Sequence, residues 1–211
     1  MAAITESAAD RAEDERGRPH YHPIGIFFHW AMAALLLFQL GWGWWVSSLP
    51  AGYDKLAGYA IHALVGLALL SLAFMRAGWR MIAPFILPEL EKPEDLPGWQ
   101  RLAAELTHFA LYCVMFALPV TGWLMISQTA GEEIVLPLGW SAPVFPLPVD
   151  LSFIERAQLE QRAETAHLVL VWITTGLLAM HIGAALKHQF IDKDTVLARM
   201  IPWLFKTKPR P

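Results

Sequence analysis

The sequence predicts an all-α membrane protein, a four-helix transmembrane bundle with both termini cytoplasmic. The chain contains four apolar stretches of about 17–23 residues, which is the length that a hydrocarbon core of roughly 30 Å requires. Hydrophobic residues make up 55% of the 211 residues and charged residues only 17%, below the roughly one quarter that is usual in soluble domains. Lys and Arg are concentrated on one side of the expected membrane, which sets the orientation.

The predicted bundle covers residues 21–205 and is flanked by two polar segments. Residues 1–20 are rich in Ala and charged side chains, and we expect them to form a disordered tail. Residues 206–211 form a short basic tail. The four membrane spans are expected at about residues 24–46, 59–75, 106–126 and 165–186.

Three connections join these spans. Ser47 to Asp54 is a short turn, and residues 84–98, with four prolines, are expected to form a loop. Residues 127–164 form the longest connection, and within it Ser152-Phe-Ile-Glu155 has the pattern of a capping box that opens a helix running into the fourth span. Pro119 lies inside the third span and should kink it.

The distribution of Lys and Arg gives the orientation. The two tails and the second connection hold thirteen of the 16, and the other two connections hold only Lys55, Arg156 and Arg162. Because short cytoplasmic loops carry the excess of Lys and Arg, the third connection is predicted outside. Its acidic residues are Glu132, Glu133, Asp150, Glu155, Glu160 and Glu164. The outer surface is therefore expected to be acidic overall.

Several classes of protein are excluded or disfavoured. The chain has no glycine-rich nucleotide loop, no His-Glu-x-x-His motif and no basic nucleic-acid surface, and a single cysteine cannot form an internal disulfide. We expect that cysteine, Cys113, to be buried and unreactive, and we expect His20 and His22 to be solvated residues of the N-terminal region.

The fourth span carries a histidine near each end, His167 and His181. Fourteen residues separate them, which is about four helical turns and roughly 21 Å of rise, with the two rings within roughly 40° of each other. Ionisable side chains at membrane depth cost a few kcal/mol each and are therefore functional candidates. A lone histidine at a helix start is more often an interfacial polar residue, but one helix with an imidazole in each leaflet predicts two stacked cofactors, which we interpret as haems.

The predicted topology sorts the other histidines by depth. The outer leaflet offers one pair, His62 and His167. The inner leaflet offers His29, His108 and His181, with His188 just beyond the boundary. Depth alone leaves His29 and His108 open as the inner partner of His181. Two imidazoles make a haem iron six-coordinate, which favours electron transfer over oxygen binding.

Motifs from all four spans resemble those of the prokaryotic cytochrome b561 family of dihaem membrane cytochromes. The matching segments run from about Tyr21 to Pro202 and occur in the family's order. They are Phe28-His29-Trp30, Ile61-His62 with Gly66 and Arg76, His108-Phe-Ala-Leu-Tyr112 followed by Leu118-Pro119-Val-Thr-Gly122, His167, and His181-Ile-Gly-Ala-Ala-Leu-Lys-His188 followed by Asp194.

The resemblance implies two b haems, one between His29 and His181 and the other between His62 and His167. It assigns no catalytic residue. His108, His188 and Arg76 are candidates for haem-propionate or quinone contacts, although His108 could equally face a neighbouring helix and Arg76 could simply anchor its helix at the interface.

The resemblance also implies a function. Members move electrons between a periplasmic donor, either a small molecule or a protein, and ubiquinone as the candidate substrate in the bacterial inner membrane. The expected partners are membrane lipid, quinone and that donor, without nucleic acid. One branch of the family oxidises superoxide, and other relatives are haem-binding anchor subunits of a partner oxidoreductase. An acidic outer surface would steer a basic protein donor better than a small anion. A scaffold or transporter without haem is the third alternative.

Overall fold

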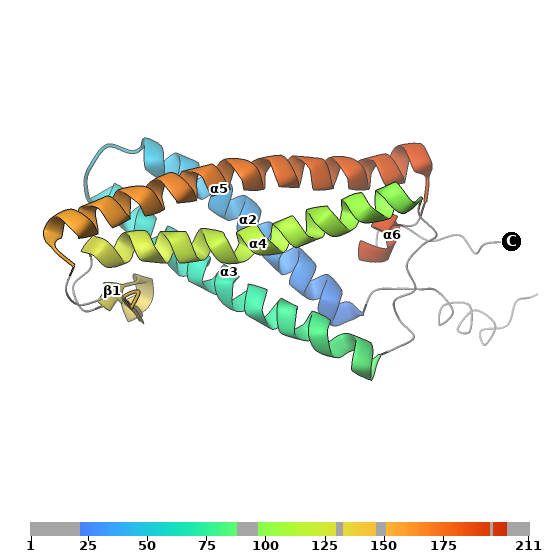
Figure 1. The fold of residues 1–211 in the computed structure, drawn as a ribbon, viewed down its shortest axis with the longest axis horizontal. Coiled ribbons are helices and arrows are strands. Elements are labelled where there is room, and N and C mark those ends of the chain that lie inside the picture. The colour runs from blue at the N-terminus through green and yellow to red at the C-terminus, as the bar shows by residue number, and fades with distance from the viewer. Residues whose placement is uncertain (1–21, 88–96, 130–132, 147–150, 195, 202–211) are drawn as a thin grey trace, which may run out of the picture.

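The computed structural model describes residues 22–87, 97–129, 133–146, 151–194 and 196–201 (Figure 1). The predicted tails at residues 1–20 and 206–211, and with them His20, lie outside the described residues, as does most of the predicted loop at residues 84–98.

Four long helices make up most of the described chain. They are α2 (Pro23–Ser48), α3 (Tyr53–Ile86), α4 (Gly98–Thr129) and α5 (Phe153–Lys187). Within the described residues, these four helices are long and apolar enough to cross a membrane, which confirms the predicted bundle. Between α4 and α5 the chain forms a small antiparallel hairpin of β1 (Glu133–Val135) and β2 (Ser141–Pro143) around the 3-10 turn η1 (Pro137–Gly139). After α5 come a π-helical turn η2 (His188–Asp192) and a short helix α6 (Val196–Met200).

The start of α5 follows directly from its sequence. The Ser152 hydroxyl accepts from the backbone N–H of Glu155, and the Glu155 carboxylate accepts from the backbone N–H of Ser152, so the predicted capping box is confirmed. The helix then runs unbroken for 35 residues. At 1.5 Å of rise per residue it is longer than a hydrocarbon core requires, so its first turns project beyond the span.

Two helix ends differ from the sequence-based expectation. His22 is half-buried and is not a solvated residue, because its Nδ1 accepts from the backbone N–H of Ile24 and caps α2. Its ring also packs on Trp79. The C-terminal end of α3 also differs: the helix continues through Pro84 to Ile86 instead of ending before the proline. Pro84 lacks the N–H that would donate to the Arg80 carbonyl, but helical hydrogen bonding resumes after it, with Leu87 N donating to the Ala83 carbonyl at 2.8 Å.

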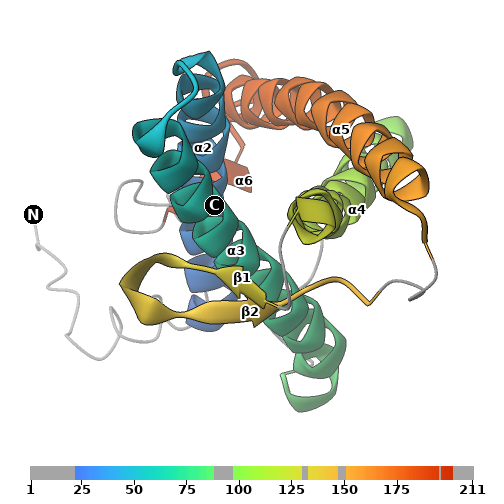
Figure 2. The same cartoon turned by 90° about the vertical axis from the view of Figure 1, so that its left-hand side faces the viewer.

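The helices associate as two neighbouring pairs. Backbone contact is closest between α4 and α5 and between α2 and α3, with α3 also touching α4, while α2 and α5 scarcely approach each other. Figure 2 shows the four helices end-on, with the hairpin across the near end of the bundle. The hairpin is tied to α4, because Trp123 Nε1 donates to the Pro143 carbonyl at 2.8 Å and Phe145 N donates to Ser127 Oγ at 2.7 Å.

A small apolar cluster lies in the middle of the bundle. It is built by α2, α3 and α4, and its buried members are Met32, Leu36, Leu69, Ala73 and Met115. Large apolar side chains on the outward faces, such as Phe27, Phe74, Phe109 and Trp172, are exposed. Outward apolar faces of this extent are expected where lipid surrounds a bundle. Cys113 belongs to the same outward surface and is exposed, so the expectation of a buried thiol was wrong.

Candidate functional site

Two histidine rings face each other near the end of the bundle that carries the hairpin. His62 on α3 and His167 on α5 have ring centroids 6.3 Å apart, with an interplanar angle of 71°. We call them the outer pair. Metal–imidazole bonds are about 2.0–2.1 Å long, so two imidazoles on opposite sides of one metal have centroids about 6.4 Å apart. The outer pair therefore has the separation that axial ligation of a single haem iron requires.

Small residues surround the outer pair. A Cβ atom added at Gly43 would lie 3.0 Å from His62 Cε1, and one added at Gly122 would lie 3.5 Å from His167 Cε1. The buried Nδ1 of His62 has no hydrogen-bond partner among the described residues. A buried ring nitrogen without a partner and a glycine-lined ring edge both fit a cofactor held at this level.

The other ring of the outer pair, that of His167, is held by hydrogen bonds to α4. His167 Nδ1 lies 3.1 Å from the carbonyl oxygen of Leu118 and 3.0 Å from Thr121 Oγ1. A carbonyl oxygen only accepts, so the hydrogen bond to Leu118 requires the proton on Nδ1. The other nitrogen, Nε2, is then the one with a lone pair for a metal.

Three histidine rings gather near the other end of the bundle. His181 on α5 lies 6.1 Å from His29 on α2 and 5.4 Å from His108 on α4, measured between ring centroids. The first separation is close to the roughly 6.4 Å expected for two ligands across one metal, whereas the second is about 1 Å too short. The geometry therefore favours His29 over His108 as the partner of His181, a choice that depth in the membrane alone left open.

An arginine and a tyrosine border these inner rings. Arg76 Nε on α3 donates to the Tyr112 hydroxyl on α4 at 3.1 Å, and the guanidinium lies over the same ring, with Cζ 5.6 Å from its centroid. Arg76 is also within electrostatic reach of His29, His108 and His181. Because Tyr112 follows His108 by one helical turn, this contact fixes a positive charge beside the inner rings.

His188 lies just beyond the inner rings, in the turn after α5. Its Nδ1 is 2.5 Å from Asp194 Oδ2 and 3.3 Å from Asp192 Oδ2. The three side chains could offer ligand atoms within 4.8 Å of one another. However, Lys187 Nζ also lies 2.5 Å from Asp192 Oδ2, so an ammonium already balances that carboxylate. Nearby, Trp30 Nε1 donates to the Met200 carbonyl at 2.9 Å and joins α6 to α2.

The central apolar cluster separates the two histidine levels. Met32 and Leu36 follow His29 on α2, Leu69 and Ala73 follow His62 on α3, and Leu178 of α5 packs against the same cluster between His167 and His181. Water is thereby excluded from the middle of the bundle, which lowers the local dielectric around both levels.

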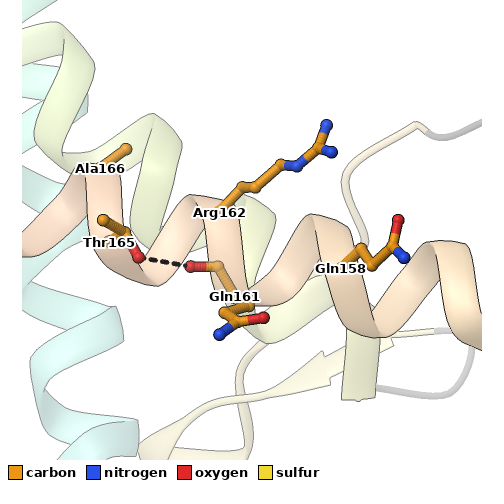
Figure 3. Close-up of a pocket in the computed structure, with 5 residues that line it drawn as sticks. All are labelled: Gln158, Gln161, Arg162, Thr165 and Ala166. Atoms are coloured by element: carbon orange, nitrogen blue, oxygen red, sulfur yellow. Dashed lines mark hydrogen bonds between the residues drawn. The ribbon is translucent and has the colours of Figure 1, made fainter.

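A surface hollow elsewhere on α5 has no part in this arrangement. Figure 3 shows that Gln158, Gln161, Arg162, Thr165 and Ala166 line it, all from one helix, with the Arg162 side chain extending outward. The drawn hydrogen bond runs from Thr165 Oγ1 to the Gln161 carbonyl within that helix. It is an open hollow on the first turns of α5, before His167.

Sequence reasoning did not identify two residues that support the outer pair. Gln39 is a buried polar residue inside the apolar first span, and its Nε2 donates to the His62 carbonyl at 2.8 Å. Gly66 leaves room for it, because an added Cβ would lie 3.5 Å from Gln39 Nε2. The isolated glutamine in an apolar run was the available signal for the first residue. Thr121 lies in the Leu118-Pro119-Val-Thr-Gly122 motif, but the motif alone assigned it no role, since threonine is common in membrane helices.

Apolar helices whose histidines meet at two depths define a multi-pass membrane protein suited to holding metal porphyrins between its helices. A family model described as prokaryotic cytochrome b561 matches residues 20–203. The chain belongs to the prokaryotic cytochrome b561 family. It is therefore a multi-pass bacterial membrane protein of a family that binds haem b and takes part in electron transport.

Three relatives illustrate the range of the family. The chain is 33% identical over 186 residues to cytochrome b561 homolog 2 of Escherichia coli, which covers 86% of this chain and 90% of that protein. It is 28% identical to cytochrome b562 of Cereibacter sphaeroides, over 87% of this chain and 96% of the relative. It is 26% identical to the probable superoxide oxidase CybB of Yersinia pestis, over 86% and 96% of the two chains.

Proposed function

We propose that this protein is a dihaem cytochrome that carries electrons across the bacterial inner membrane, between a periplasmic donor and the ubiquinone pool. His62 and His167 would hold an outer haem, and His29 and His181 would hold an inner haem. The observation that carries the proposal is the presence of two facing histidine pairs, with centroids 6.3 Å and 6.1 Å apart, at opposite ends of α5.

The chain's own groups have distinct tasks in this function. Bound haem supplies a one-electron couple, and two histidine ligands leave its iron without an open coordination position. The neutral imidazoles hold the irons, the apolar cluster keeps water out of the middle of the bundle, and Arg76 offers a positive charge to an inner haem propionate. A propionate there would lie beside Tyr112 and His108.

The quinone end of the pathway belongs on the inner side, near His188. Reduction of a quinone consumes protons as well as electrons, and the His188 imidazole, which contacts Asp194, offers a polar group just after α5, at the end that carries the inner rings. Trp30, whose Nε1 bonds the Met200 carbonyl, provides an aromatic wall on the same side. The positive-inside distribution of Lys and Arg supports a cytoplasmic location for this end.

The donor is the least constrained part of the proposal. The described part of the outer connection carries Glu133, Glu155, Glu160 and Glu164 against Arg156 and Arg162, which favours a basic protein donor. The similarity to the probable superoxide oxidase of Yersinia pestis favours superoxide as a second candidate. A role as the haem-binding anchor subunit of a partner oxidoreductase would instead require co-purification of that partner.

Anaerobic spectroscopy of the purified protein in liposomes tests the function. The haems are first reduced, and a short-chain ubiquinone analogue is then added while absorbance in the α-band region is followed. We expect rapid reoxidation by the quinone, slowed in a His188→Ala variant that retains both haems. Consumption of superoxide coupled to quinone reduction would identify the second candidate donor. Reduced haems that ubiquinone does not reoxidise would contradict the proposal.

A further inference from the structure

The two ligands of the proposed outer haem have unequal surroundings. Among the described residues, His62 Nδ1 has no hydrogen-bond partner, whereas His167 Nδ1 lies within 3.1 Å of two oxygen atoms of α4. The two oxygens are the Leu118 carbonyl and the Thr121 hydroxyl. Only one of the two imidazoles is therefore held in a fixed orientation and tautomer by a neighbouring helix.

The hydrogen bonds of Thr121 determine the direction of its contact with His167. The hydroxyl lies 2.9 Å from the Ala117 carbonyl and 2.8 Å from the Leu118 carbonyl, and its single proton goes to one of these acceptors. Its oxygen lone pairs then face His167, whose Nδ1 already carries a proton for Leu118. Thr121 consequently accepts a second interaction from the same N–H.

Pro119 lies between the two acceptors on α4, one residue after Leu118 and two before Thr121. Pro119 has no N–H, so the Met115 carbonyl four residues earlier lacks its helical donor. Gly122 follows Thr121 and lies beside the His167 ring, where an added Cβ would be 3.5 Å from Cε1, an ordinary van der Waals distance.

We propose that Thr121 is a positioning residue that, together with the Leu118 carbonyl, lowers the reduction potential of the outer haem through His167. The inference rests on the proposed function, because it needs a haem between His62 and His167. An Nδ1–H that donates to oxygen makes the imidazole a stronger electron donor at Nε2, and this stabilises ferric over ferrous iron. The inner haem would be held on α5 by His181 instead, so its reduction potential should not change.

Redox titration of the full-length protein tests the inference, with the α-band of each haem followed against potential. Thr121→Val keeps the shape of the side chain but removes the acceptor oxygen. We expect the ferric preference of the outer haem to fall by roughly threefold to tenfold. Since tenfold corresponds to about 59 mV for one electron, the outer potential should rise by up to about 59 mV. A His167→Ala variant, which retains only the inner haem, identifies which potential belongs to which haem.

Two control variants separate positioning from packing. Thr121→Ser retains the hydroxyl and should restore the wild-type potential. Thr175→Val removes a hydroxyl of the same kind, which bonds the Val171 carbonyl at 2.8 Å on α5, and should change neither potential. The low-spin ferric electron paramagnetic resonance signal of the outer haem should shift only in Thr121→Val.

Each outcome gives a distinct answer. A rise confined to the outer haem, or selective loss of that haem in Thr121→Val but not in Thr121→Ser, supports the inference. Two haems with unchanged potentials in Thr121→Val would overturn it while leaving the proposed function intact. Equal shifts or loss of both haems would also overturn it, because a general packing effect would then explain the result. A wild-type protein with fewer than two haems would overturn the proposed function as well.

Discussion

Gly43 of α2 lies so close to His62 of the outer pair that even a methyl group at this position would contact the ring. A Cβ atom at this position would lie 3.0 Å from His62 Cε1, whereas one at Gly41, two residues earlier on α2, has nothing within 4 Å. We predict that Gly43→Ala displaces the His62 ring and removes most of the outer haem while the inner haem remains. Haem content and α-band spectra of the purified variant measure this.

Gly41→Ala is the matched control for that substitution. It makes the same chemical change on the same helix and should leave both haems in place, with a slight gain in helix stability of up to about 1 kcal/mol. Full haem content in Gly43→Ala would show that the ring has more freedom than the structure indicates.

His108 gives a second test at the scale of single residues. Its ring centroid lies 5.4 Å from that of His181, too close for both to bind one iron from opposite sides. We predict that His108→Ala retains two haems, whereas His29→Ala retains one. The pyridine haemochrome assay counts them. The reverse result would make His108 the inner ligand.

Contacts between helices set the electrostatics of the inner level. Arg76 of α3 is held by Tyr112 of α4, and its charge acts on His29, His108 and His181. Because a nearby positive charge disfavours the additional charge of ferric haem, we predict that Arg76→Gln lowers the inner potential. A tenfold change in the ferric-to-ferrous preference corresponds to about 59 mV, and redox titration resolves a shift of that size.

An exposed arginine supplies the comparison for Arg76. Arg101 lies near the start of α4 and is exposed. Its replacement by Gln should leave both potentials unchanged, since a charge in high dielectric is screened. If Arg76→Gln leaves the inner potential unchanged, the charge of Arg76 does not act on the inner haem.

At the scale of whole elements, the sequence predicted the features that depend only on residues close together in the chain. Apolar length predicted four membrane helices, and the capping box at Ser152 predicted the start of α5. Helix ends depended on contacts the sequence does not show. The cap by His22 requires a ring that also packs on Trp79, and the continuation of α3 past Pro84 requires that its last turn tolerate one missing hydrogen bond.

The same distinction holds for the candidate site. The spacing of His167 and His181 along one helix could be calculated from the sequence, and the separation of the two levels follows from it. Depth alone could not choose between His29 and His108, because both begin spans on the same side. The family resemblance implied His29, and the ring separations favour it. The roles of Gln39 and Thr121 depend on which helix faces which, a property of the packed bundle.

At the scale of the whole molecule, one helix supplies a histidine to each level and the other helices supply the rings that face it. The outer pair joins α3 to α5, the inner rings join α2 and α4 to α5, and the apolar cluster fills the space between. The helices α2 and α5 scarcely touch through their backbones, although their rings approach at both levels, as in the 5.9 Å contact between Trp44 and Trp172. Because α2 and α5 meet mainly through side chains, the space between them can accommodate a flat cofactor at each level.

The haem-to-protein ratio of the purified full-length chain tests this arrangement most directly. The pyridine haemochrome assay, calibrated against quantitative amino-acid analysis, should give two b haems per chain. A ratio of one or of zero would contradict the account, because at least one of the two facing histidine pairs would then hold no iron.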